Sequence, residues 1–372
     1  MEWSSRESWW QELRDRVDAG ERLSFEDGVR LYQSNDVLAT GSLADMIRRR
    51  LNGNKAFFTY NQHINYSNIC VNRCRFCAFG KDRGDPEAYQ MSIEEVAQKV
   101  KEKLHEPITG VHIVGGIHPD LPYDYYVEML REVKKVRPEL HIHAFTAVEI
   151  AHLAEISGQT VNETLCHLRE AGLNSLPGGG AEVFSPRVRE RLCAKKLPPE
   201  RWLDVARTAH ELGIRTNATM LYGHIETMEE RVAHLMALRE LQDETGGFMA
   251  FIPLAFHPRN TALSELSTTT GFDDLKNIAI SRLMLDNFPH IKAYWVMIGP
   301  KLAQIAMAFG ADDMDGTIIE EKITHMAGAG TAQGMTRPEI LRLIREAGYT
   351  PVERDAVYNV IEGNRSPLSV HR

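Results

Sequence analysis

Hydrophobic and polar positions follow two patterns along the chain, one typical of helices and one typical of strands. A helix is predicted where Ile93, Val96 and Val100 share one face. Ser92 and Glu95 form a capping box in front of it. The helical spacing also predicts helices at 122–136, 160–171, 198–212, 227–245, 273–287 and 300–309. Apolar runs bounded by turn residues predict strands at 56–65, 110–116, 141–147, 173–180, 215–223, 248–256 and 290–299, with a weaker eighth near 310–312.

This order of elements predicts an α/β fold. Strands separated by helices of this length pair in parallel through right-handed crossovers. We therefore expect a complete or nearly complete (β/α)8 barrel over 56–312, closed with eight strands or open on one side with six. A helical extension at 1–55 precedes it, and an α-rich tail at 313–372 packs on it. No linker indicates that either segment folds independently.

Composition excludes several classes of function. The chain has 372 residues, of which 43% are hydrophobic and 25% charged, as in ordinary soluble proteins. A net charge of −8 indicates no nucleic-acid partner. The N-terminus lacks the apolar region of a signal peptide, and the longest apolar run, 250–256, is too short to span a bilayer. We expect a cytoplasmic protein without membrane insertion.

Three of the five cysteines need a chemical explanation. Cys70, Cys74 and Cys77 form a C-x3-C-x2-C pattern directly after the first predicted strand, where the active sites of barrels form. An odd number of cysteines argues against a disulfide framework. Cys166 and Cys193 lie alone in helical segments, where we interpret them as small buried side chains.

The crowded thiolates favour an iron–sulfur cluster with one open iron. A short loop lets three sulfurs bind three corners of one [4Fe–4S] cubane, and no fourth cysteine lies nearby. The fourth iron then stays free for a substrate, as catalytic metal sites keep a vacant position. The alternatives are a zinc site with a distant fourth ligand and reduced structural cysteines.

Glycines and polar residues at other predicted strand ends mark the same rim of the barrel. Gly115 and Gly116 close the second strand, and a glycine run that ends at Glu182 follows the fourth. That run matches neither the dinucleotide fingerprint nor the phosphate loop. Each of the remaining polar residues has either a structural or a catalytic role: Thr146, Glu149, Asn217, Thr219, His224, Glu226, His257, Arg259 and Asn260.

A specific resemblance covers residues from about 30 to 358. It is carried by NICVNRCRFCAF, GGIHPD, HAFTAVEI, SLPGGGAE, TNATMLYGHIET, LQDETGGFMAFIPLAFHP and LMLDNFPHIKAYW. Together these segments resemble the aminofutalosine synthases, a family of radical S-adenosylmethionine (SAM) enzymes. The cysteine motif alone would indicate only the superfamily.

The resemblance implies a cofactor site at the rim of a radical SAM barrel. Cys70, Cys74 and Cys77 would hold the cluster, whose open iron is chelated by SAM. The other expected SAM contacts are Phe76 against adenine, Gly115 and Gly116 near the methionine amino group, Glu182 and Asn217. Where the family usually has Glu after the glycine pair, this chain has Ile117.

The resemblance also implies a reaction. The 5′-deoxyadenosyl radical of SAM adds to 3-[(1-carboxyvinyl)oxy]benzoate, and decarboxylation as CO2 or bicarbonate yields 6-amino-6-deoxyfutalosine and methionine on a route to menaquinone. A flavodoxin- or ferredoxin-type reductant is expected. Arg259, His224 and Glu149 are the catalytic candidates, with Arg259 suited to a substrate carboxylate. His257 is a further donor.

Three other functions stay open. The sister enzyme that makes cyclic dehypoxanthinyl futalosine shares fold and cluster but abstracts hydrogen. An iron–sulfur electron carrier and a zinc-stabilised binding protein belong to other classes.

Overall fold

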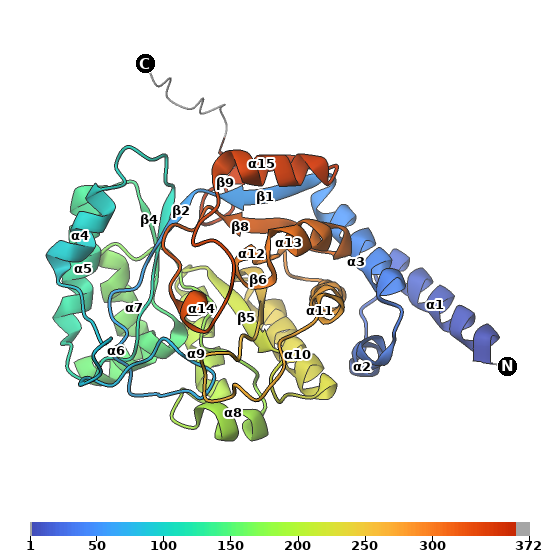
Figure 1. Ribbon diagram of the computed structural model, residues 1–372, viewed down its shortest axis with the longest axis horizontal. Helices are drawn as coiled ribbons and strands as arrows, with labels where there is room; N and C mark the ends of the chain where they lie inside the picture. Colours follow the sequence, from blue (N-terminus) through green and yellow to red (C-terminus); the bar gives the residue numbers. More distant parts are fainter. Residues whose placement is uncertain (1, 362–372) are drawn as a thin grey trace, which may run out of the picture.

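Eight parallel strand positions surround the centre of the molecule. A computed structural model describes residues 2–361, with side chains from residue 8 onward (Figure 1). The strands are β1 Lys55–Thr59, β2 Asn61–Ile64, β3 Gly110–Ile113, β4 His141–Ala144, β5 Thr216–Tyr222, β6 Phe248–Ala255, β7 His290–Ile291 and β8 Asp313–Gly316. Tyr60 separates β1 from β2, which are two halves of one barrel strand.

Parallel pairing closes the ring. The strands β2, β3 and β4 are neighbours, and bridges at Ser175 and Leu176 continue the ring from β4 to β5. β5, β6 and β7 follow in order, Lys292 bridges to Asp313 at the start of β8, and β8 pairs with β1. The predicted α/β barrel is confirmed, and its form is the closed one with eight strand positions.

Helices connect the strands and cover the outside of the ring. The helices are α4 Ile93–Lys101, α5 Tyr123–Val136, α6 Ala147–Ser157, α7 Val161–Glu170, α8 Pro186–Cys193, α9 Pro199–Glu211, α10 Met228–Thr245, α11 Gly271–Met284, α12 Trp295–Ile298, α13 Pro300–Ala306, the 3-10 turn η1 Met307–Phe309, α14 Ile323–Met326 and α15 Arg337–Glu346. Capping boxes begin α4, α7, α10 and α15, and that of α4 is formed by the predicted Ser92 and Glu95. None of the described helices combines the length and apolar character that a membrane span needs.

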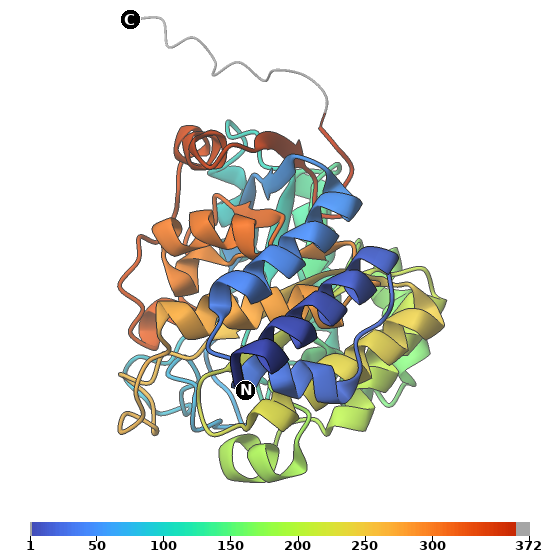
Figure 2. The same ribbon diagram turned by 90° about the vertical axis from the view of Figure 1, so that its right-hand side faces the viewer.

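Three N-terminal helices pack on one side of the barrel. These are α1 Glu2–Ala19, α2 Phe25–Gln33 and α3 Val37–Asn52 (Figure 2). The helix α2 packs on α10 and α11, α3 packs on α11, and α1 packs on α3. Tyr32 on α2 is buried and its hydroxyl donates a 2.6 Å hydrogen bond to Asn277 on α11. The extension therefore shares its core with the barrel helices.

Three strands differ from their predicted ranges. Only Ser175 and Leu176 form bridges within 173–180, and the seventh strand ends at Ile291, followed by α12. A short apolar run such as 290–299 does not by itself distinguish strand from helix. The eighth strand lies at Asp313–Gly316, not at 310–312, because its inward acidic side chains are neutralised by partners from other elements, as in the pair of Asp313 with Arg354.

The C-terminal segment adds a strand that the sequence did not predict. β9 Thr350–Arg354 pairs in parallel with β1, on the side away from β8 (Figure 1). Behind it, Tyr358 stacks on His290 at the start of β7, with ring centroids 3.7 Å apart. This segment covers the N-terminal end of the barrel. The division into 1–55, 56–312 and 313–372 stays a prediction.

Candidate active site

One cavity runs through the barrel from the cysteines inward. Its volume is about 650 Å³, within the range of small-molecule sites. The loop of residues 65–92 between β2 and α4, called the cysteine loop below, covers its mouth. Part of the cavity wall is apolar. It is formed by side chains on β5 and β6 and just after β3, among them Val114, Leu221, Ile252 and Leu254.

All three motif cysteines line this cavity. Cys70, Cys74 and Cys77 are half-buried free thiols. Burial raises the pKa of Cys77, although Gly80 donates its backbone N–H to the sulfur at 3.4 Å. A hydrogen bond with Cys193 on α8, together with burial, raises the pKa of Cys74. The thiols of Cys74 and Cys77 are therefore protonated at neutral pH, and metal binding requires the loss of their protons.

The loop is held to its surroundings by backbone hydrogen bonds. Val71 donates its N–H to Ile117 O at 3.0 Å, and Arg75 donates to Leu192 O at 2.8 Å. These contacts join the loop to the end of β3 on one side and to α8 on the other. The cysteines thus have a defined position even without a metal.

The three thiols suit an iron–sulfur cubane by their chemistry and position. They lie on one short loop and line the same cavity. A zinc ion needs its ligands to converge on one point. In a cubane each thiolate binds a different iron, so the three sulfurs stand apart around the cluster. The residues present therefore fit a [4Fe–4S] cluster.

The glycine pair after β3 lets the strand end meet the cysteine loop. A Cβ at Gly115 would lie 2.5 Å from the Tyr66 ring. A Cβ at Gly116 would overlap the carbonyl oxygen of Ile69 and lie 2.9 Å from the Cβ of Cys70. Both glycines also line the cavity, so their backbone is open to a ligand.

A buried ion pair lies beside Phe76. Glu182 forms it with Lys196, whose ammonium lies 5.4 Å from the centroid of the Phe76 ring. Although burial disfavours its charge, Lys196 has a raised pKa because the Glu182 carboxylate stabilises the ammonium. All three residues line the cavity. Lys196 was not among the predicted site residues, because nothing distinguishes it in sequence from a surface lysine.

Asn217 lies deeper, on β5. Its amide Nδ2 is 3.2 Å from Nε2 of His143 on β4, and both side chains line the cavity. His63 and His112 face the same space from the matched positions of β2 and β3. The three histidines were also missed. In a strand, alternate residues face the same side. The positions of the histidines within HINYSNIC, GVHIV and HIHAF therefore indicate only weakly that they face the barrel interior.

Glu149 does not line the cavity. It belongs to the capping box of α6, so Oε2 accepts hydrogen bonds from Thr146, through N–H at 2.7 Å and through the hydroxyl at 2.8 Å. Oε1 accepts from the Tyr66 hydroxyl at 2.8 Å and from Gly115 N–H at 3.0 Å. Burial raises the pKa of this carboxyl. The structure thus places Glu149 behind Gly115. Thr146 and Glu149 are three residues apart, and this spacing in the sequence is typical of the start of a helix.

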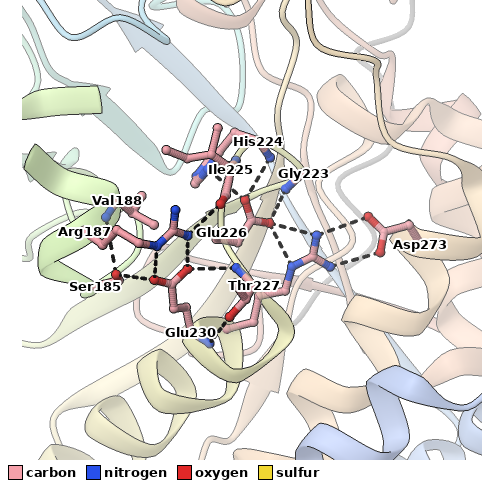
Figure 3. A network of polar contacts seen from close by, with 11 residues as sticks. Ser185, Arg187, Val188, Gly223, His224, Ile225, Glu226, Thr227, Glu230 and Asp273 are labelled. Carbon is pink, nitrogen blue, oxygen red and sulfur yellow. Dashed lines mark hydrogen bonds and ion pairs between the residues drawn. The ribbon is translucent and has the colours of Figure 1, made fainter. Parts of the chain in front are cut away.

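The other two catalytic candidates also lie outside the lining. His224 is buried, with Nδ1 2.7 Å from the carboxylate of Glu226 (Figure 3). Arg259 is exposed after β6. His257 does line the cavity, and its Nε2 lies 3.0 Å from Met297 O. The cavity therefore brings together the cysteines, Phe76, the glycine pair, Glu182 and Asn217, but not Glu149, His224 or Arg259. Their roles stay predictions.

Glu226 joins the end of β5 to two helices. Its side chain is 1% exposed and pairs with Arg231 on α10 at 2.8 Å, and Arg231 reaches Asp273 on α11 at 3.0 Å (Figure 3). Although burial opposes ionisation, His224 and Arg231 lower the pKa of Glu226 to about 2. The network links the end of β5 to both helices.

Glu226→Gln should lower the free energy of unfolding by about 2–3 kcal/mol at pH 7. This is a small effect for the loss of one partner of a buried ion pair, because Arg231 would still pair with Asp273. The folded pKa lies below the ordinary 4.5, so the contribution is complete above about pH 5 and is lost as the pH falls toward 2. Denaturant unfolding between pH 7 and 4 would measure it. Glu240→Gln, at an exposed position of the same helix, is the matched control. Equal stability of the two variants at pH 7 would contradict the structural role.

The fold and this site together have the features of a radical SAM enzyme: a parallel barrel with a three-cysteine loop at its mouth. The family model of the radical SAM superfamily matches residues 64–238, and that of the CofH/MqnC C-terminal region matches residues 245–366. Methylornithine synthase (PylB) has a similar solved structure, with a TM-score of 0.73 and 20% identity over 91% of this chain and 97% of that chain.

Curated relatives narrow the assignment. Aminodeoxyfutalosine synthase of Thermus thermophilus is 49% identical, with coverage of 94% of this chain and 95% of the relative. The enzyme of that name from Streptomyces coelicolor is 45% identical over 97% and 96%. Cyclic dehypoxanthine futalosine synthase of Halalkalibacterium halodurans is 39% identical over 94% of each. The chain belongs to the aminodeoxyfutalosine synthase family of radical SAM enzymes, which use a [4Fe–4S] cluster and SAM as co-substrate.

Proposed function

We propose that the enzyme joins the 5′-deoxyadenosyl group of SAM to 3-[(1-carboxyvinyl)oxy]benzoate, with loss of one carboxyl group as CO2 or bicarbonate. The products are 6-amino-6-deoxyfutalosine and methionine, on a route to menaquinone. The observation that carries the proposal is the single cavity that connects the three cysteines with an apolar wall and a polar interior. The high identity to aminodeoxyfutalosine synthases over nearly the whole chain supports the choice of substrate.

The residues at the mouth would hold the two cofactors. Cys70, Cys74 and Cys77 would bind the cluster, which when bound supplies the electron that cleaves SAM. Phe76 offers a face for adenine, and the Gly116 backbone is open to the polar end of SAM. The other proposed contacts, Glu182 and Asn217, line the same space.

The rest of the barrel protects the reaction. The ring of strands encloses the sides of the cavity, the C-terminal segment covers one end, and the cysteine loop covers the other. Apolar side chains such as Ile252 and Leu254 exclude water from the space between SAM and substrate. A reactive carbon centre then meets the substrate before it meets a hydrogen donor from solvent.

The main alternative is the reaction of the sister enzyme, which the family resemblance implies begins with hydrogen abstraction; cyclic dehypoxanthine futalosine synthase is 39% identical to this chain. With SAM deuterated in the adenosyl 5′-methylene group, dithionite and the enol-ether benzoate, we expect a nucleoside product that keeps both deuterons. Anaerobic incubation followed by mass spectrometry would measure it. Product that forms only with the enol ether present would support addition. Release of labelled 5′-deoxyadenosine in step with substrate loss would overturn it.

The proposal includes a flavodoxin- or ferredoxin-type reductant. On the outer side of the cysteine loop, Val71 and Asn72 line a surface hollow together with Lys195 and Arg201. Arg73 of the same loop is exposed. The same hollow is lined by Glu155 and Asp204, so an acidic electron carrier would contact Lys195, Arg201 and Arg73 beside these two carboxylates.

A further inference from the structure

The inner end of the cavity is polar, although barrel interiors are ordinarily filled by branched apolar side chains. His63, His112 and His143 occupy paired positions of β2, β3 and β4, and the rings of neighbours lie 4.6 Å and 5.3 Å apart. Lys292 and Asp315 line the cavity from β7 and β8. We call these five residues the floor. A polar floor in a barrel calls for a polar ligand.

The floor has hydrogen-bond donors to spare. Lys292 is buried, and its ammonium donates one 3.2 Å hydrogen bond, to Asp315. An ammonium has three N–H donors, so two of them lack a protein acceptor within the described chain. His112 Nε2 is buried and has no hydrogen-bond partner there. Buried donors without acceptors are costly, which favours a ligand that supplies them.

The floor holds one positive and one negative side chain, Lys292 and Asp315, which form an ion pair. Although burial favours the neutral acid, Lys292 and Arg354 hold the pKa of Asp315 below its ordinary value. Arg354 lines the inner end as well and pairs with Asp313 behind it at 2.6 Å. Burial lowers the pKa of His112, so this ring is a neutral donor or acceptor at pH 7. The charges of Lys292 and Arg354 are balanced by Asp315 and Asp313, so the spare N–H donors of Lys292, and not a net charge, favour a ligand with acceptor oxygens.

The wall above the floor is apolar. Ile252 and Leu254 from β6 and Val114 after β3 line the same cavity as the floor, and Ile252 is next to Lys292 in the register of β6 with β7. A ligand that fits both regions has a flat or aliphatic body and a carboxylate at one end. The carboxylate would take the spare donors, and the body would contact the wall.

We propose that the floor binds the ring carboxylate of an aromatic carboxylic acid, with Lys292 as its charge partner and His112 as a neutral hydrogen-bond donor. This inference rests on the proposed function and adds the orientation of the substrate. The ring carboxylate lies inward, so the enol ether faces the cysteine loop. Lys292 then determines selectivity for substrates with that carboxylate.

The test compares two ligands on the full-length protein with its reconstituted cluster, without reductant, so that no turnover occurs. The ligands are 3-[(1-carboxyvinyl)oxy]benzoate and 2-phenoxyacrylate, which lacks only the ring carboxylate. Calorimetry should show about ten- to a hundredfold weaker binding of 2-phenoxyacrylate to the wild type. Lys292→Met should bind both ligands equally, at the weaker affinity. Lys276→Met, a lysine outside the cavity, should keep the wild-type ratio.

Further variants keep the test decisive if Lys292→Met does not fold. Lys292→Met/Asp315→Asn removes the charge of both partners, and His112→Phe keeps an aromatic ring while it removes the donor. Each should reduce the ratio of the two affinities. An unchanged ratio in the folded variants would overturn the inference. Absence of wild-type binding to the enol-ether benzoate would instead overturn the proposed function.

Discussion

Replacement of Cys74 by alanine should abolish the cleavage of SAM. The sulfur of Cys74 lies between the cavity and Cys193, at the centre of the three-cysteine loop. Loss of a residue that hydrogen-bonds a metal ligand typically lowers metal affinity or activity about ten- to a hundredfold. Loss of a ligand itself should therefore lower the rate of SAM cleavage by more than about a hundredfold. Methionine formation under dithionite, with iron and sulfide content, would measure it.

Cys193 makes this experiment more demanding. Its thiol contacts Cys74 and could replace it as a ligand in the single variant. The double variant Cys74→Ala/Cys193→Ala removes that possibility, and Cys193→Ala alone is the matched control. We expect the control to keep its cluster and its activity. Wild-type rates of SAM cleavage in the double variant would refute the assignment of Cys74 as a ligand.

Gly116→Ala should have the second largest effect. The added Cβ would overlap the Ile69 carbonyl oxygen, which belongs to the backbone just before Cys70. Backbone cannot rotate away as a side chain does, so the cysteine loop would have to move. Overpacking of this kind costs about 3 kcal/mol. We expect a lower melting temperature, a lower iron content after reconstitution and a corresponding loss of SAM cleavage.

Gly84→Ala is the matched control for this variant. Gly84 lies in the same loop, but a Cβ there would meet no atom within 4 Å. Its iron content and stability should equal those of the wild type. If Gly116→Ala also kept its full iron content and activity, the close contact between the end of β3 and the cysteine loop would not be needed for the cluster.

Local patterns in the sequence predicted much of this protein. The capping box of α4 depends on two residues three positions apart, Ser92 and Glu95, and the structure has it as predicted. The thiols of Cys70, Cys74 and Cys77 lie within one short loop, so their shared chemistry was visible without a fold. The same holds for the glycine pair after β3, which lies at a strand end.

Other parts depended on contacts between distant segments. Glu149 looked like a rim residue, but α6 begins at Ala147 and the carboxylate turns to cap it. His224 joins a network with α10 and α11 instead of the cavity. The strand β8 was placed too early because its inward acidic residues resemble a loop until Lys292 and Arg354 neutralise them.

The sequence by itself determined the alternation of strands and helices and the metal chemistry of the cysteine loop, because both depend on neighbours in the chain. Only the tertiary structure decided that the barrel closes and that Lys196, His112 and Lys292 face its cavity. The side of a strand on which a residue lies depends on register with the adjacent strands. That register is set by packing between segments far apart in the chain, which no local pattern records.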